Sequence, residues 1–155
     1  MTAQSDLAAI ARTIIDSNDY MVLATADEIG LPWASPVWYA PEEYRELFWV
    51  SSPEARHSRN LAARPELAIV IFDSTVAVGS GQGVYMSAVA DQPSGEDLDR
   101  GIEIFSRRSE AQGAEAWTRD QVVSPSHLRL YRATVSEHSI LDPAASRDQR
   151  IQVTP

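Results

Sequence analysis

Three short segments with the composition of β-strands follow one another early in the sequence. They are YMVLATA (20–26), WASPVWYA (33–40) and LFWVS (47–51), and each is rich in aromatic and β-branched residues. The turn-forming stretches DEIGLP and PEEYRE separate them. Short strands joined by such turns predict an antiparallel meander. Because an edge strand exposes unpaired N–H and C=O groups, the meander needs further strands that let the sheet curl or stack.

The remaining sequence supplies those strands and adds helices. Pro36 places the second strand at a sheet edge or at a bulge, since proline cannot donate a ladder hydrogen bond. The apolar run LAIVIFD predicts a central strand buried on both faces, and a polar tail begins at Ser139. We expect helices at 5–17, 53–63 and 95–121, the last broken near Gly113, and strands at 67–73, 84–91 and 127–138.

About six antiparallel strands in a chain of 155 residues predict one mainly β, α+β domain over residues 1–155, with helices around a small barrel. No repeat, low-complexity segment or long linker divides the sequence. The N-terminal stretch MTAQSDLAAIARTII lacks a basic segment followed by an uninterrupted apolar run. We therefore expect neither a signal peptide nor a transmembrane helix, and a cytoplasmic protein.

The composition excludes several kinds of chemistry. Cysteine is absent, which excludes disulfides and thiol nucleophiles, and all 13 basic residues are arginine. Without a lysine amine the chain cannot hold pyridoxal phosphate as a Schiff base. The formal net charge of −9 at pH 7 argues against an extended surface for nucleic acid or for an anionic membrane. A local positive pocket stays compatible with that charge.

The densest basic cluster, Arg56, His57 and Arg59, falls in the first turns of the helix that follows the meander. Cations are unfavourable there because the helix dipole is positive at its N-terminus. Two interpretations stay open. Either the cluster is a solvated face with Glu54 and Glu66 as counter-charges, or it is an anion site where a phosphate meets the cations and the free backbone N–H groups.

Other features are weaker signals. Ser52 and Pro53 fit the cap and the first position of the same helix. The loop GSGQG (79–83) lacks the spacing and the following helix of a dinucleotide-binding fingerprint. His127 and His138 are eleven residues apart and have no set of Asp or Glu residues arranged around them, so we expect no metal site.

Tryptophan occurs in two of the early strand segments. Trp33, Trp38 and Trp49 are expected in the core or at an interface, as is Tyr39. Trp38 and Trp49 are also candidates for contact with a bound ligand.

Three longer stretches are informative together: GLPWASPVWYA, WVSSPEARHSRNLAARPELAI and VYMSAVAD. They resemble the pyridoxamine 5′-phosphate oxidase-like, flavin-binding split-barrel family. The first is similar to the family's Gly-x-Pro-x-x-(Arg/Ser)-(Pro/Met)-Val strand. The second is similar to its strand–turn–helix, where (Ser/Ala)-Arg-(Lys/His) precedes Asn-Leu and a proline. The resemblance runs from Tyr20 to Asp91, with a weaker echo at HLRLYRATV.

The resemblance implies a six-stranded antiparallel split β-barrel with flanking helices, working as a homodimer with two FMN molecules at its interface. It also implies a flavin-dependent oxidoreductase, with hydride transfer through the flavin N5 to an unknown small-molecule substrate and no required catalytic side chain. By motif position, the isoalloxazine ring would be lined by Ser35, Pro36, Val37 and Trp38, and Val50 and Ser51 would lie by the ring or the ribityl chain. Arg56 and His57 would hold the phosphate, and Gln82 or Gly83 would approach the flavin from the partner subunit.

The sequence also departs from that family. Enzymes that oxidise the pyridoxine vitamer carry Arg at the position of Ser35 and Lys at that of His57, and Arg129 and Arg132 are not clear equivalents of their substrate residues. Oxidation of pyridoxamine phosphate is therefore not expected. Alternatives are a deazaflavin-dependent reductase that uses Arg59 or Arg64, a non-enzymatic flavin-binding or sensing protein, and a dimer without cofactor. The segment 92–126 departs most, and we expect it to cap the cleft.

Overall fold

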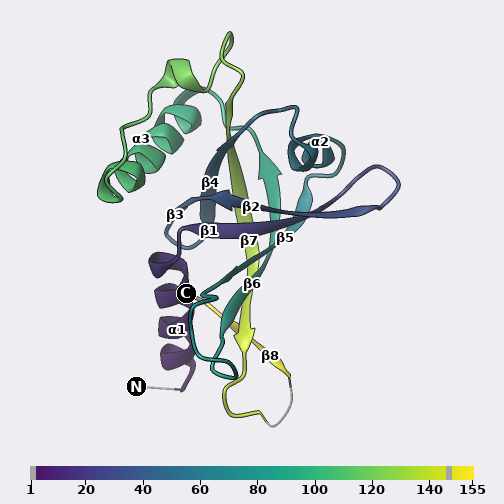
Figure 1. The fold of residues 1–155 in the computed structure, drawn as a ribbon, viewed down its shortest axis with the longest axis vertical. Helices are drawn as coiled ribbons and strands as arrows, with labels where there is room; N and C mark the ends of the chain where they lie inside the picture. The colour runs from purple at the N-terminus through teal and green to yellow at the C-terminus, as the bar shows by residue number, and fades with distance from the viewer. Residues whose placement is uncertain (1–2, 146–147) are drawn as a thin grey trace.

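The computed structural model describes residues 3–145 and 148–155, and its strands form one antiparallel sheet (Figure 1). The strands are β1 (Tyr20–Ala26), β2 (Pro32–Trp38), β3 (Ala40–Glu42), β4 (Glu46–Ser51), β5 (Glu66–Phe72), β6 (Gly83–Asp91), β7 (Arg129–Leu141) and β8 (Arg150–Val153). Their order is β2-β1-β5-β6-β7-β4-β3, and β8 pairs with β7 beside this path. The sheet curls, so β2 approaches β4 across its inner face.

Helices pack around this sheet. They are α1 (Ala3–Ser17), α2 (Arg56–Ala63), α3 (Gly95–Ala111) and the short 3-10 helix η1 (Arg119–Gln121). Figure 1 shows α1 and α3 at separate ends of the sheet, with α2 on the far side from both. No helix in the described part of the chain is long and apolar enough to span a bilayer.

The buried apolar side chains form two clusters on the two faces of β4. Leu47 and Trp49 point into the cluster enclosed by the curled sheet and α1, whereas Phe48 points into the cluster under α3. The second cluster is tight. A Cβ at Gly101 of α3 would lie 2.7 Å from Leu130 Cδ2 and 2.9 Å from Phe48 Cε1, so glycine permits the close approach of this helix.

The mainly β, α+β split-barrel class is confirmed, but the sheet has eight strands among the described residues instead of six. The expected turn PEEYRE contributes β3, and the chain beyond Ser139 continues β7 and adds β8. The three-stranded meander is also wrong, since β2 pairs with β1 while β4 pairs with β3 and β7. Local turn signals predicted the strands correctly, but the choice of partners depends on how the sheet curls.

Strand β5 is buried on one face only, which corrects the prediction of burial on both. Leu67, Ile69 and Ile71 are buried, while the alternate residues Ala68 and Phe72 are exposed. No described segment covers that outer face. Pro36 lies on an edge strand as expected, in a register that continues without a bulge; the register shift is in β6, at Ser87/Ala88.

Candidate functional site

A turn links β4 to α2. The Ser52 hydroxyl accepts a hydrogen bond from the Glu54 backbone N–H (3.1 Å), and the Ala55 N–H donates to the Ser52 carbonyl (3.1 Å). The helix therefore begins at Arg56, and the predicted cap at Ser52 and start at Pro53 are wrong. The hydroxyl of Ser52 stabilises the turn instead of the helix, because it is used before the helix starts.

The first turn of α2 has no side-chain cap. Ala55 occupies the N-cap position, and no acidic residue lies in the first turn. An α-helix leaves its first N–H groups without intrahelical partners and concentrates positive potential there. The start of α2 thus combines free backbone donors with the side chains of Arg56 and His57. Such an arrangement suits an anion.

His57 is a buried and neutral member of this cluster. It is only 7% exposed, and its Nε2 lies 2.7 Å from the Ser51 Oγ. Burial lowers the pKa of His57 below its ordinary value, because the imidazolium form is poorly solvated there. His57 therefore contributes hydrogen bonding, and not a full positive charge, at neutral pH.

Arg56 supplies the exposed charge at this end of the helix. Its guanidinium Cζ lies 4.2 Å from the centroid of the Trp33 ring, which is within the range of a cation–π contact. No carboxylate in the described part of the chain forms an ion pair with Arg56. Trp33 is 41% exposed, so the indole and the guanidinium are both accessible to a ligand.

Hydrogen bonds fasten α2 to the β1–β2 hairpin. The buried Asn60 donates through Nδ2 to Thr25 Oγ1 (3.0 Å), and that hydroxyl donates to the Trp33 carbonyl (3.4 Å). At the end of the helix, Arg64 donates to the Glu28 carbonyl (2.9 Å). These contacts fix the position of the edge strand β2 relative to the start of α2.

Strand β2 presents its residues in alternation. Ser35 and Val37 lie on the face of Trp33, whereas Pro36 and Trp38 lie on the opposite face. Because β2 is an edge strand, one row of its N–H and C=O groups meets no other strand among the described residues. The main chain of residues 35–38 is therefore available to a ligand.

The tryptophans Trp38 and Trp49 are packing residues in this structure. The Trp38 ring makes an edge-on contact with Phe105 at 4.5 Å between centroids, and its Nε1 donates to Gln112 Oε1. Trp49 is fully buried and stacks on Tyr131 at 5.4 Å. The core interpretation of both side chains is the one that the structure supports.

Two predicted cofactor residues lie apart from the α2 start. Val50 is half-buried and packs on the cluster under α3. Gln82 precedes Gly83, which pairs with Phe72 at the end of β5 remote from α2. The Gln82 amide donates to the Leu141 carbonyl (2.8 Å) and accepts from the Leu141 N–H (2.9 Å). One chain thus brings Ser51, Arg56 and His57 together without Gln82.

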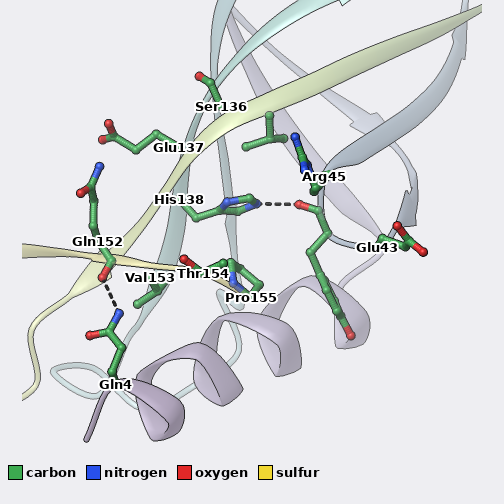
Figure 2. Close-up of a pocket in the computed structure, with 12 residues that line it drawn as sticks. Gln4, Glu43, Arg45, Ser136, Glu137, His138, Gln152, Val153, Thr154 and Pro155 are labelled. Carbon is green, nitrogen blue, oxygen red and sulfur yellow. Dashed lines mark hydrogen bonds between the residues drawn. The ribbon is translucent and has the colours of Figure 1, made fainter.

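A cavity of about 630 Å³ lies elsewhere, between α1, the β3–β4 turn, β7 and β8 (Figure 2). His138 forms part of its wall, and its Nε2 lies 2.6 Å from the Tyr44 carbonyl oxygen. Burial lowers the pKa of His138, so the neutral ring donates to that carbonyl. The described residues contain no group of three or more His, Asp or Glu placed to hold a metal.

The family model of pyridoxamine 5′-phosphate oxidase matches residues 7–140. The chain belongs to the pyridoxamine 5′-phosphate oxidase family. This match spans β1 to β7 and includes the whole α2 region. No curated protein sequence matches the chain significantly.

Solved structures share the fold of this family member. A heme binding protein from Mycobacterium smegmatis has a TM-score of 0.73 and 23% identity, covering 98% of this chain and 59% of that one. An F420 reductase has a TM-score of 0.61 and 14% identity, covering 83% and 95%. A FAD-binding protein from Mesorhizobium loti has a TM-score of 0.61 and 15% identity, covering 90% and 94%. At these identities the likeness is one of fold, and the chain spans about 59% of the M. smegmatis protein.

Three residues at this site, Trp33, Asn60 and Thr25, were not predicted from the sequence. Trp33 was predicted only as a core or interface aromatic, whereas it lies exposed under Arg56. Asn60 was visible only as the asparagine of an Asn-Leu step, and nothing in the sequence links it to Thr25. That hydrogen bond joins residues 35 positions apart, so it depends on the tertiary fold.

Proposed function

We propose that this chain is a flavin-dependent oxidoreductase that binds FMN non-covalently. The observation that carries the proposal is the start of α2, where an uncapped helix, an arginine without a carboxylate partner among the described residues, and the Ser51–His57 pair meet. Membership of the pyridoxamine 5′-phosphate oxidase family supports it. The fold likeness to a FAD-binding protein agrees with a flavin ligand.

Arg56 is the residue that would hold the FMN phosphate. An exposed cation–π contact contributes about 0.5–1 kcal/mol, whereas a hydrogen bond to a charged group contributes about 1.5–3 kcal/mol. The contact with Trp33 therefore does not prevent the guanidinium from turning to a phosphate. Two parallel N–H groups of the guanidinium match the geometry of phosphate oxygens.

Ser51 and His57 would complete the phosphate site without adding charge. In the tautomer with a proton on Nε2, His57 donates to the Ser51 Oγ, which frees the hydroxyl proton to point at a phosphate oxygen. The first backbone N–H groups of α2 supply further donors. The neutral histidine therefore orients a donor, while Arg56 balances the negative charge.

The edge strand β2 would bind the ring system. The row of main-chain groups along Ser35–Trp38 that points away from β1 faces no strand in the described part of the chain. Such groups suit the polar edge of an isoalloxazine ring. When bound, FMN would supply hydride chemistry at its N5 atom, and the protein supplies position and hydrogen bonds.

A homodimer is part of the same proposal. The outer face of β1, β5 and β6 exposes large apolar side chains, with Tyr20 at 62%, Phe72 at 50% and Val89 at 50%. Exposed apolar side chains gathered on one sheet face are typical of a protein interface, and a second copy of this chain is the occupant we propose. Gln82 borders this face beside a cavity lined by Phe72 and Tyr85, so a partner's Gln82 would complete the flavin site.

The first test is the visible absorbance spectrum of the purified protein with and without added FMN, together with the mass of any released cofactor. Flavin bands that shift on binding would support FMN, and a colourless protein that ignores FMN would contradict it. Reduction of bound FMN by NADH or NADPH no faster than that of free FMN would make the protein a flavin binder instead of an enzyme.

A deazaflavin is the second candidate cofactor. It is favoured by the fold likeness to an F420 reductase and by the exposed Arg59, which borders a cavity of about 340 Å³ between α2 and the β1–β2 turn. Asp27 and Glu28 line the same cavity and would repel an anionic tail. FMN is therefore the first choice, and competitive titration with the two cofactors decides between them.

A further inference from the structure

The exposed side chain of Arg56 is held by one neighbour. Its Cζ lies 4.2 Å from the centroid of the Trp33 ring, and the guanidinium forms no hydrogen bond or ion pair with any described residue. An exposed arginine samples many rotamers, and fixing one of them when a ligand binds costs free energy. The contact with Trp33 reduces that cost only if the indole is itself fixed in place.

The indole is fixed by the docking of the β1–β2 hairpin on α2. Thr25 and Trp33 are directly opposite each other in the register of this hairpin, so their side chains project from the same face. Arg56 and Asn60 are about one helical turn apart, so they also share a face. Asn60 donates to Thr25 at 3.0 Å, and both of these residues are buried. This pairing brings Trp33 under Arg56.

The contact leaves the hydrogen-bonding capacity of the guanidinium intact. A cation–π contact is made with the face of the aromatic ring, whereas the N–H donors of a guanidinium form a rigid fork in the plane of the group. Arg56 can therefore bind a phosphate through its N–H groups while its Cζ stays over the indole of Trp33. The same contact then orients the guanidinium before and after a ligand binds.

Arg59 shows the alternative on the same helix. It is exposed like Arg56, but it contacts no aromatic ring in the described part of the chain. No carboxylate among the described residues forms an ion pair with it either. Of the two exposed arginines of α2, only Arg56 therefore has a described neighbour that selects one orientation of its side chain.

We propose that Trp33 is a positioning residue of the phosphate site, which orients the Arg56 guanidinium in advance and thereby sets a preference for FMN over riboflavin. This inference rests on the proposed FMN site. It adds a residue that the family resemblance does not supply, because Trp33 occupies a variable position of the Gly-x-Pro-x-x-(Arg/Ser)-(Pro/Met)-Val strand. Riboflavin is FMN without the phosphate, so it gains nothing from Arg56. Loss of the indole should therefore affect the binding of FMN and not that of riboflavin.

The first test compares the two flavins on the full chain, with binding measured by quenching of the flavin fluorescence. Trp33→Leu keeps an apolar side chain but removes the π face, and it should weaken FMN binding about 2- to 5-fold, the value of an exposed cation–π contact. Riboflavin binding should stay unchanged in this variant. Trp33→Phe restores a weaker π face, so it should lose less FMN affinity than Trp33→Leu does.

Two further variants separate positioning from packing. In the Arg56→Ala background, Trp33→Leu should cause no further loss of FMN affinity, because the two residues act through one contact. Leu31→Ala changes another exposed apolar side chain just before β2, and it should leave the affinity for both flavins unchanged. The proposal would be overturned by an unchanged FMN affinity in Trp33→Leu, by equal losses of FMN and riboflavin, or by additive losses in the double variant.

Inorganic phosphate tests the role of Trp33 without any flavin. The full chain is titrated with phosphate and followed by NMR at the Arg56 Nε–Hε group, and Trp33→Leu should weaken phosphate binding about 2- to 5-fold. Phosphate binding that depends on Trp33 in a chain that ignores FMN would contradict the flavin function and support the positioning role. Binding of FMN, with a phosphate affinity that Trp33→Leu leaves unchanged, would do the reverse. Absence of binding of both FMN and phosphate would overturn both.

Discussion

Two arginines of this chain have opposite surroundings. The Arg132 side chain is 15% exposed and meets three carboxylates: Asp91 at 2.6 Å, Asp97 at 3.2 Å and Glu46 at 3.3 Å. Arg56 is exposed and meets an indole ring but no carboxylate among the described residues. The chain has 22 acidic residues against 13 arginines, so an arginine without an acidic partner is the less expected of the two.

The comparison distinguishes an arginine whose charge stabilises the fold from an arginine whose charge is accessible to a ligand. Arg132 joins β7 to β4, to the end of β6 and to the first turn of α3, and its neighbours raise its pKa further above the ordinary value. The charge of Arg132 is neutralised by these carboxylates, and the ion pairs help to hold α3 in place. The charge of Arg56 stays free beside an uncapped helix, which is why it and not Arg132 is the candidate for binding a phosphate.

Removing the structural arginine should have the largest effect. Arg132→Ala leaves Glu46, Asp91 and Asp97 close together, with Arg100 as the remaining counter-charge through its two 2.9 Å contacts to Glu46. We expect the free energy of unfolding to fall by about 2–4 kcal/mol, measured by urea denaturation.

The control for this variant is an exposed arginine in a simple helix pair. Arg107 lies 3.6 Å from Glu103 with both side chains mostly exposed, so Arg107→Ala should change stability by about 0.5 kcal/mol or less. Equal losses in the two variants would mean that the Arg132 contacts do not act as a structural network.

Removing the available arginine should change binding and spare stability. Arg56→Ala should weaken FMN binding by about 10- to 100-fold, the value of one charged hydrogen bond, because the guanidinium is the only cation proposed at the phosphate. Its unfolding free energy should fall by about 1 kcal/mol at most, for the lost contact with Trp33.

Arg59→Ala is the matched control on the same helix, since Arg59 is also exposed but faces the β1–β2 turn. FMN affinity is measured by fluorescence quenching of the flavin. Unchanged affinity in Arg56→Ala would remove the phosphate assignment, and a larger loss in Arg59→Ala would place the phosphate at Arg59 instead.

Lowering the pH should weaken the ion pairs around Arg132. Hydrogen bonds from Arg100 and the charge of Arg132 hold the pKa of Glu46 below its ordinary value of 4.5. The ionised form is thus favoured in the fold, so this stabilisation is present above pH 4.5 and is lost as the pH falls through the lowered pKa. Urea melts of Glu46→Gln and of the natural chain between about pH 5 and 3 should show a smaller acid loss in the variant.

His57 should produce the smallest effect, at higher pH. Its pKa is lowered by burial from 6.5, so below pH 6.5 the unfolded chain takes up a proton that the folded chain resists. Stability should fall as the pH drops from about 7 toward 5, and His57→Gln should remove part of that slope. The exposed His127→Gln is the control; the same slope in both variants would contradict a buried neutral His57.

The positions of most elements were predictable because their signals are local. Strands 20–26 and 84–91 match β1 and β6 within one residue, and the helix break near Gly113 lies just after the end of α3. The predicted boundaries of elements were wrong where a residue typical of one local structure serves another one in the fold. Ser52 looks like a helix cap in the sequence, but its hydroxyl stabilises the turn before Arg56.

The site was predictable in part for the same reason. Ser51, Arg56 and His57 are neighbours in sequence, so a strand–turn–helix places them together almost regardless of the rest of the fold. Trp33 belongs to the earlier β1–β2 hairpin, and its position under Arg56 needs that hairpin to dock on α2. Sequence periodicity carries no information on that docking.

The sequence alone determined the alternation of short strands and turns, the helix ended by Pro65, and the basic cluster at its start. The tertiary structure alone decided which strands pair, which arginine is neutralised by carboxylates, and that Trp33 lies beside Arg56. The reason is the distance along the chain over which each kind of interaction acts. Backbone stereochemistry and residue spacing act over a few residues, whereas pairing, burial and charge neutralisation depend on packing summed over segments far apart in the chain.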